Sequence, residues 1–296
     1  MTRLAALRET LSETVRIFSR HDGRMLAGAT AFFALVSVAP LLVIALVVAG
    51  ALVDEHAAQR EVFRGLALWI GPEGARAVRS MVADARASES GAEVTALSVA
   101  VIVWGATRLF SHLQRALDHL WGVRPREQAA FRARAMVQLR RRLVAFAMVL
   151  SCGAAVVSSL AFRTLIVAAE RLLGVGALAR WHLIDHVLTL GAVSALFTLI
   201  FRALPHVRIT WRDALVGSAV TTALFALGRV AVTAYLGRKA LGSAFGAAGS
   251  VVLLLLWTYY SSQIFFLGAA FIAARRRVEG RPLEPTPDAV ALREEP

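Results

Sequence analysis

Long uninterrupted apolar runs dominate the pattern of hydrophobic and polar positions along this chain. Residues 240–274 carry no charged side chain and end at three arginines, 275–277. At about 1.5 Å per residue, a helix of that length exceeds the roughly 30 Å hydrocarbon core of a bilayer. The run therefore predicts a membrane-spanning helix that either begins outside the core or breaks near Gly242, Gly246 or Gly249.

Five further runs complete a set of six predicted spans. Two of them carry no charge, and the other three carry one charged residue each, which is Arg108, Asp185 or Arg229. The predicted fold class is thus an all-α integral membrane protein, a six-transmembrane-helix bundle over residues 25–274. The predicted spans are 25–53, 94–113, 143–162, 183–201, 214–236 and 245–274.

The basic residues between the runs predict how the bundle is oriented. If the N-terminus is cytoplasmic, 21 of the 33 lysines and arginines fall in cytoplasmic segments and 10 in outer segments. Cytoplasmic loops are enriched in Lys and Arg. We therefore expect both termini in the cytoplasm.

Three segments outside the spans have patterns of their own. Residues 1–24 predict a cytoplasmic amphipathic helix in the membrane interface, because apolar positions recur at helical spacing opposite charged ones. Residues 54–93 predict an outer helical loop with two amphipathic stretches. Residues 275–296, rich in proline and glutamate, predict a disordered cytoplasmic tail. The apolar stripe of the first helix comprises Leu4, Leu7, Leu11, Val15 and Phe18.

Composition supports a membrane protein and excludes other classes. Hydrophobic residues make up 57% of the chain and the mean hydropathy is +0.62, too apolar for an ordinary soluble domain. The net charge of +13 is compatible with nucleic-acid binding, but most of the basic residues lie between the apolar runs, and no RNA-binding motif accompanies them. We expect membrane lipids, rather than nucleic acid, as partners. The single cysteine, Cys152, excludes an intramolecular disulfide.

Charged residues inside the spans are the first candidates for function, since a charge in lipid needs a partner or water. Arg108 is expected nearer the cytoplasmic face, where it either snorkels to lipid phosphates or contacts an anion inside the bundle. Arg229 and Asp185 are expected at similar depths near the outer face. They either pair with each other or reach the interface separately.

Polar groups near the centre of the last span are the second candidates. Tyr259 and Gln263 lie there beside two serines, and such groups either line a polar cavity or form interhelical hydrogen bonds worth about 0.6–2 kcal/mol. His182, Asp185 and His186 share a helical face but lack the general-base glutamate of a zincin motif. We predict no catalytic residue, cofactor or metal site.

Four separate segments together resemble the YihY/virulence factor BrkB family of bacterial inner-membrane proteins. They share its order and spacing over roughly residues 15–275, although Ala270 stands where the family often has an acid. The matching segments are AFFALVSVAPLL at 31–42, Trp104 to Val123 with Arg108 and LWGV, Leu204 to Gly217 with WRD, and Phe245 to Ala269 with LWTYY.

The resemblance implies a bacterial inner-membrane location, six spans and cytoplasmic termini, with a role in serum resistance and envelope lipid handling. Together with the intramembrane arginines, it favours a protein that transports or flips an amphipathic, anionic, lipid-like substrate. The alternative is a scaffold that supports the envelope without transport. The family once carried a ribonuclease label, but the scattered Asp118, Glu127 and Asp213 predict no nuclease site, and we expect no enzyme activity.

Overall fold

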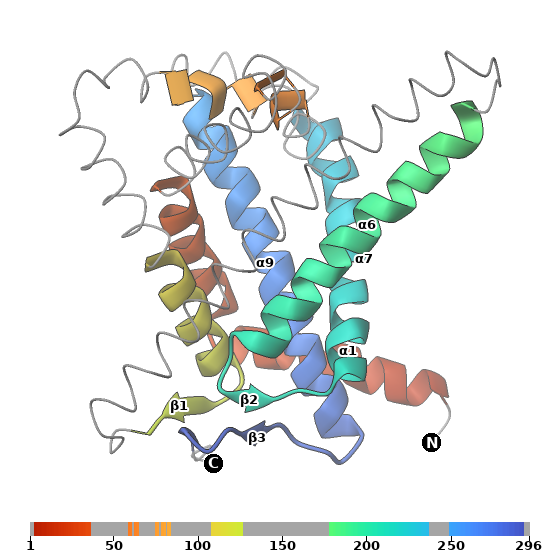
Figure 1. Cartoon of the computed structure of the whole chain (residues 1–296). Coiled ribbons are helices and arrows are strands. Elements are labelled where there is room, and N and C mark those ends of the chain that lie inside the picture. The colour runs from red at the N-terminus through yellow and green to blue at the C-terminus, as the bar shows by residue number, and fades with distance from the viewer. Residues whose placement is uncertain are drawn as a thin grey trace.

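The computed structural model describes residues 3–36, 108–126, 178–236 and 249–292, with short stretches between 59 and 83. These residues form long helices that stand side by side, with a set of short strands at one end (Figure 1). The predicted span 143–162 lies outside the described residues, as do most of the predicted spans 25–53 and 94–113 and most of the predicted outer loop.

Helix α9, Gly249–Val278, is 30 residues long and runs the length of the described bundle (Figure 1). Its segment Leu254–Val278 is long and apolar enough to cross a membrane, and no other helix among the described residues meets both conditions. The helix corresponds to the predicted span 245–274 and continues four residues beyond it. Gly280, with a φ of 68°, follows the helix end and lets the chain turn back on itself.

Helices α6, Leu178–Ala203, and α7, Trp211–Leu236, form a hairpin that contains two of the predicted spans. Thr210 caps the start of α7, because its hydroxyl accepts a hydrogen bond of 3.3 Å from the N–H of Asp213. The carboxylate of Asp213 also suits the positive end of the helix dipole. Helix α7 packs against both α6 and α9.

Helix α1, Arg3–Arg20, lies across the strand end of the bundle and contacts α9 (Figure 1). Asp22, with a φ of 50°, turns the chain after α1, and a second helix, Gly23–Val36, follows. A third, unlabelled helix comprises residues 108–120.

The predicted apolar stripe of α1 divides into two parts in the structure. Phe18 is buried in the core, whereas Leu7, Leu11 and Val15 are 52%, 52% and 60% exposed. The three exposed side chains are spaced four apart and form one face, as an interfacial helix requires.

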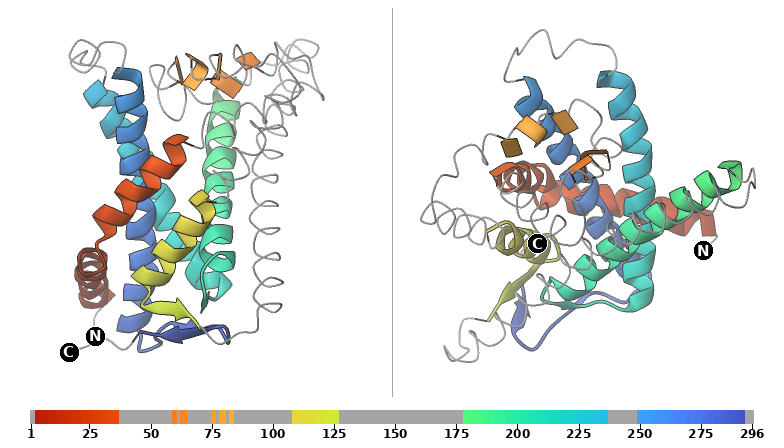
Figure 2. Two further views of the ribbon diagram at one scale, coloured as in Figure 1. Left: turned by 90° about the vertical axis from the view of Figure 1, so that its left-hand side faces the viewer. Right: turned by 45° about the horizontal axis from the view of Figure 1, so that its top comes forward.

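Four short strands tie the chain together at the end where α1 lies. Strand β1, Val123–Pro125, pairs antiparallel with β4, Ala289–Ala291. Strand β2, Val207–Arg208, pairs antiparallel with β3, Glu284–Pro285. Figure 2 shows these strands at one end of the bundle and the short stretches between 59 and 83 at the other.

The C-terminal segment corrects a prediction. Residues 275–296 were expected to be disordered because they are polar and rich in proline, but residues 275–278 complete α9 and the chain is ordered to Leu292. The physical reason is that β3 and β4 satisfy their backbone groups on two loops far away in the sequence. A prediction of disorder from composition considers only the local lack of apolar residues and ignores such distant backbone partners.

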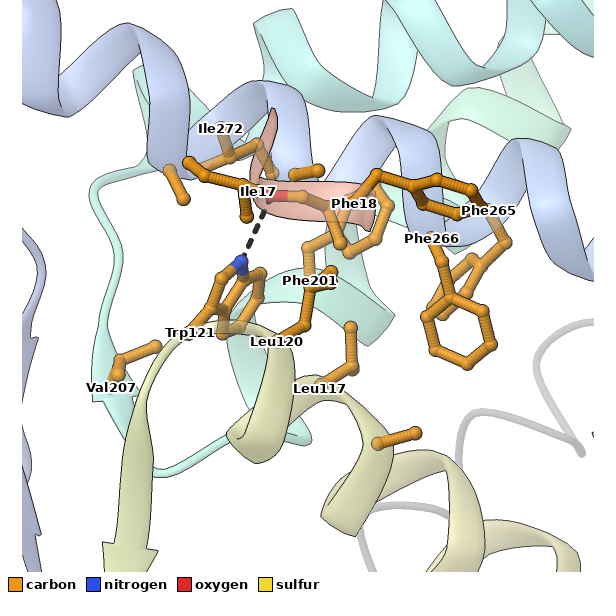
Figure 3. Close-up of a cluster of buried hydrophobic side chains, with 14 of the residues drawn as sticks. Ile17, Phe18, Leu117, Leu120, Trp121, Phe201, Val207, Phe265, Phe266 and Ile272 are labelled. Atoms are coloured by element: carbon orange, nitrogen blue, oxygen red, sulfur yellow. Dashed lines mark hydrogen bonds between the residues drawn. The ribbon is translucent and has the colours of Figure 1, made fainter. Parts of the chain in front are cut away.

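The core sits between α1, helix 108–120 and the strand-proximal halves of α6, α7 and α9 (Figure 3). Leu117 and Phe201 are fully buried there, and Phe201 stacks on Phe265 at 5.0 Å between ring centroids. The indole N–H of Trp121 donates a hydrogen bond of 2.9 Å to the carbonyl of Ala269, which fixes helix 108–120 to α9.

Candidate functional site in the helix bundle

A cluster of hydroxyl groups lies in the seam between α6 and α7. The Oγ of Ser218 is 2.6 Å from Oγ1 of Thr198 and 3.1 Å from Oγ of Ser194. Ser218 is 0% and Thr198 2% exposed, whereas Ser194 is half-buried. Ser194 and Thr198 are four residues apart on α6, which places both on the face toward α7. The hydroxyls of Thr198 and Ser218 also reach the carbonyls of Ser194, at 2.7 Å, and Leu215, at 2.9 Å, so every hydroxyl of the cluster has a hydrogen-bond partner.

One turn further along α7, the hydroxyl of Thr222 lacks a partner in the described part of the chain. Thr222 is 7% exposed and its Oγ1 is buried without a hydrogen bond among the described residues. It follows Ser218 by four residues, so both lie on the α6 side of the helix. A buried hydroxyl without a partner costs about 1–3 kcal/mol. The hydroxyl of Thr222 can therefore donate a hydrogen bond that the described residues leave unused.

The other side of α7 is packed so closely against α9 that glycine is required. A Cβ at Gly268 would lie 1.8 Å from Oγ1 of Thr221, and one at Gly217 would lie 2.3 Å from a side-chain carbon of Ile272. The hydroxyl of Thr221 is satisfied within its own helix by the carbonyl of Gly217, at 2.8 Å. The α7–α9 contact is thus a dry helix pair of the small-residue type.

The two polar candidates of the last span, Tyr259 and Gln263, both lie in α9. Tyr259 is half-buried, packs against the core cluster, and lies 3.9 Å from where a Cβ of Gly28 would be. Gln263 is half-buried one turn further along. Between them, Ser261 has a buried Oγ with no hydrogen-bond partner in the described part of the chain. The structure places these groups on the same helix but not in the hydroxyl cluster of α6 and α7.

The three charged candidates are only partly described. Arg108 begins the described part of helix 108–120 and is exposed, about 20 Å along the helix axis from Trp121. Asp185 lies on α6 and Arg229 on α7, but their side chains fall outside the described residues, so the predicted ion pair between them stays a prediction.

Sequence reasoning missed a contact between a buried carboxylate and a histidine at the strand end. The carboxylate of Asp118 accepts hydrogen bonds from the backbone N–H of His206 at 2.8 Å and makes a contact of 2.6 Å with its Nδ1. Asp118 is 3% exposed. The two residues are 88 positions apart, and each appeared isolated in the sequence. The one available signal was the position of Asp118 between Leu117 and Leu120, because a carboxylate that apolar neighbours bury needs a partner.

A second buried node joins the start of α7 to the end of α9. Oδ2 of Asp213 accepts hydrogen bonds from Thr210 at 2.6 Å and from Arg276 at 2.9 Å, and Nη1 of Arg275 lies 4.0 Å from Oδ1. Burial alone would raise the pKa of Asp213, but the hydrogen bonds from Thr210 and Arg276 and the nearby arginine charges together hold it below the ordinary value. Two of the arginines that follow the last span therefore hold the end of α9 against the start of α7.

Helix α1 is fastened to α9 by a third node. Glu13 pairs with Arg16 at 2.7 Å within α1 and with Arg277 at 3.4 Å across to α9. The hydrogen bond from Arg16 is the main reason why the pKa of Glu13 lies below its ordinary value. In His21, at the end of α1, burial lowers the pKa of the imidazole.

The exposed surface of the long helices is largely apolar. Large side chains stand out from the helices at Met25, Phe32, Trp211 and Leu227, the first of them 72% exposed. In water such side chains would form apolar patches, whereas in a bilayer they meet lipid. Together with α9, these features define a helical membrane protein.

This chain belongs to the virulence factor BrkB family, whose sequence model matches residues 14–291. The match confirms the resemblance drawn from the four segments. It includes α1 from Thr14 onward, the helices and all four strands.

Curated relatives are named as membrane proteins. A UPF0761 membrane protein of Vibrio vulnificus strain YJ016 is 25% identical over 201 residues, which are 65% of this chain and 59% of that protein. A UPF0761 membrane protein of Chromohalobacter salexigens is 23% identical over 282 residues, 94% of this chain and 66% of that protein. The chain thus spans about three-fifths of the length of the relatives it matches. No solved structure matches the chain.

Proposed function

We propose that this membrane protein moves an amphipathic, anionic, lipid-like molecule across a bacterial inner membrane, through a six-span bundle whose termini are cytoplasmic. The observation that carries the proposal is the seam between α6 and α7, where the buried hydroxyls of Thr198 and Ser218 and the half-buried one of Ser194 are followed by the buried hydroxyl of Thr222, which has no partner among the described residues. A protein that only fills the membrane gains nothing from a buried donor without a partner.

Two further features support the proposal. Position 229 follows Thr222 by seven residues on α7, so helical spacing puts it on the same side as the hydroxyls. The polar positions of the seam thus lead toward an arginine, a residue suited to a phosphate or carboxylate. The exposed apolar face of α1 lies across one end of the bundle, where an amphiphile would enter or leave the membrane.

A translocation assay in liposomes tests the function. The full-length protein is reconstituted with a fluorescent anionic phospholipid, and a membrane-impermeant quencher reports how fast label reaches the outer leaflet. We expect faster movement than in protein-free liposomes, and loss of that gain in Arg108→Ala and Arg229→Ala. Arg115→Ala, an exposed arginine on the same helix as Arg108, is the matched control and should keep it.

A second pair of variants tests the seam itself. Thr222→Val keeps the shape of the side chain and removes the hydroxyl that the described residues leave without a partner, so it should slow lipid movement without loss of folded protein. Thr30→Val removes a hydroxyl that is already bonded to the carbonyl of Leu26 and should leave lipid movement unchanged. If the wild-type protein does not accelerate lipid movement at all, the scaffold interpretation gains and flipping of that phospholipid is contradicted.

A further inference from the structure

The C-terminal segment 281–292 is tied to two loops that belong to different helices. Its strand β4 pairs with β1, which directly follows helix 108–120. Its strand β3 pairs with β2, which connects α6 to α7. One short segment therefore joins parts of the bundle that are about 80 residues apart in the sequence (Figure 1).

Individual hydrogen bonds extend both ladders. At one end, the N–H of Arg126 donates to the carbonyl of Asp288 at 2.8 Å, and the N–H of Leu292 donates to the carbonyl of Gly122 at 2.7 Å. At the other, the N–H of Thr286 donates to the carbonyl of His206 at 2.9 Å. The segment is thus bonded along most of its length.

The loops joined by the segment also hold each other directly. Asp118 bonds both the backbone and the ring of His206, and the side-chain amide of Gln114 donates to the carbonyl of Leu204 at 2.8 Å. These contacts hold helix 108–120 against the end of α6 just beneath the strands.

An apolar plug separates the strand end from the hydroxyl seam. Leu117, Leu120 and Phe201 are at most 1% exposed and belong to one cluster. Phe201 lies one helical turn from Thr198, the first hydroxyl of the seam. Within the described part of the bundle, a molecule that passed through this cluster would have to part helix 108–120 from α6.

We propose that segment 281–292 is a strap that holds this end of the bundle closed, and that its release lets helix 108–120 separate from α6 and opens the seam. The strap suits reversible opening because strands of two or three residues have little stability alone. It remains attached to α9 through a turn in which the N–H of Arg281 donates to the carbonyl of Arg276 at 2.8 Å. Only the consequence for transport rests on the proposed function.

A reversible crosslink tests the strap in the full-length protein. Arg124 and Val290 are opposite each other in the β1–β4 ladder. Opposed residues in such a ladder have Cα atoms about 4.5–5.5 Å apart, within the range that a disulfide bridges. In a Cys152→Ser background, Arg124→Cys with Val290→Cys should form a disulfide that locks the strap under oxidation. Arg124→Cys alone is the matched control.

Lipid movement in liposomes is the first readout. We expect oxidation to slow it at least tenfold in the double variant, with recovery after dithiothreitol, and to leave the single variant unchanged. Equal rates in the locked and the reduced protein would overturn the strap as a gate, because the pathway would then open without its release.

Hydrogen–deuterium exchange separates failure of the strap from failure of the proposed function. Val290→Pro removes a donor from the centre of β4 and should raise exchange at least tenfold in residues 114–123 and 204–208, while α7 stays protected. This measurement does not depend on transport, so it tests the strap even if the wild-type protein moves no lipid. If exchange rises only in β1 or does not rise at all, helix 108–120 is held without the strap and the proposal is wrong.

Discussion

The contact between α7 and α9 and the strand end of the bundle are held by opposite kinds of interaction. In the first, Gly217 and Gly268 let two helices meet with almost no space between them. In the second, carboxylates, arginines and backbone groups from distant segments complete one another's hydrogen bonds, as Asp213 and Arg276 do. Close packing depends on shape alone, whereas the polar contacts depend on protonation and on access of water.

That difference divides the bundle into a fixed part and a part that can open. Lipid cannot compete for a packed helix contact, so α7 and α9 are expected to move together. Water competes readily for the short ladders of β1–β4 and β2–β3 once they are exposed. The strap lies at the strand end, where opening requires less free energy than separating α7 from α9.

The largest expected effect comes from filling the α7–α9 contact. Gly268→Leu places a side chain where even a Cβ would lie 1.8 Å from Oγ1 of Thr221. Overpacking typically costs roughly 1–3 kcal/mol, and we expect the free energy of unfolding in detergent to fall by an amount at or above the upper end of that range. Gly191→Ala is the control, because open space surrounds that helical position and alanine favours the helix by up to about 1 kcal/mol. Equal effects at both positions would contradict the packing account.

Breaking the Asp213 node should have the next largest effect. Asp213→Asn keeps the size of the side chain but removes the charge that Arg276 and Arg275 face in a buried site. Hydrogen bonds to charged groups contribute about 1.5–3 kcal/mol, and we expect a loss in that range in the same measurement. Glu279→Gln is the control at a more exposed pair with Arg275, where about 0–1 kcal/mol is at stake. A larger loss at Glu279 would show that the burial of Asp213 is unimportant.

Acid should weaken the strand end more than the helix contact. The pKa values of Asp213 and Glu13 lie below their ordinary values, so the folded protein binds fewer protons than the unfolded chain as the pH falls through this range. Their stabilisation is therefore complete well above the ordinary carboxyl pKa of about 4 and is lost as the pH falls below it. Hydrogen exchange of residues 204–213 between pH 7 and pH 3.5, corrected for the intrinsic rate, should rise. In the Asp213→Asn variant, the increase in exchange at low pH should be smaller. An unchanged increase would show that other groups cause the pH dependence.

The smallest expected effect concerns the single bond from Trp121 to α9. Trp121→Phe keeps an aromatic ring in the core and loses the N–H that donates to Ala269. A typical hydrogen bond contributes about 1 kcal/mol net, so we expect a loss of that order. Trp211→Phe, at an indole that is 54% exposed, should change the free energy of unfolding by less.

The sequence predicted the features that local patterns determine and missed those that long-range contacts determine. The apolar run after residue 240 predicted α9, since a local pattern is enough to identify a helix that must satisfy its backbone within itself. Predicting Phe18 in a membrane-facing stripe was wrong, because the same helix also covers the core and Phe18 lies on that side. The tail was predicted as disordered because the strands that order it lie far away in the chain.

The residues of the candidate site could likewise be predicted only in part from the sequence. Tyr259 and Gln263 were found because polar groups in an apolar run are conspicuous. Ser194, Thr198 and Ser218 were not, since single hydroxyls are common in membrane helices and only the crossing of α6 and α7 shows that these three meet.

The sequence by itself determined that this protein is helical and belongs in a membrane, because long charge-free runs have no other stable environment. Four local segments also determined its family. Only the tertiary structure decided which polar residues pair, as Asp118 does with His206, and how segment 281–292 joins the loops that carry β1 and β2. The physical reason is range: apolar periodicity acts within one helix, whereas hydrogen-bond partners are chosen by how the helices pack.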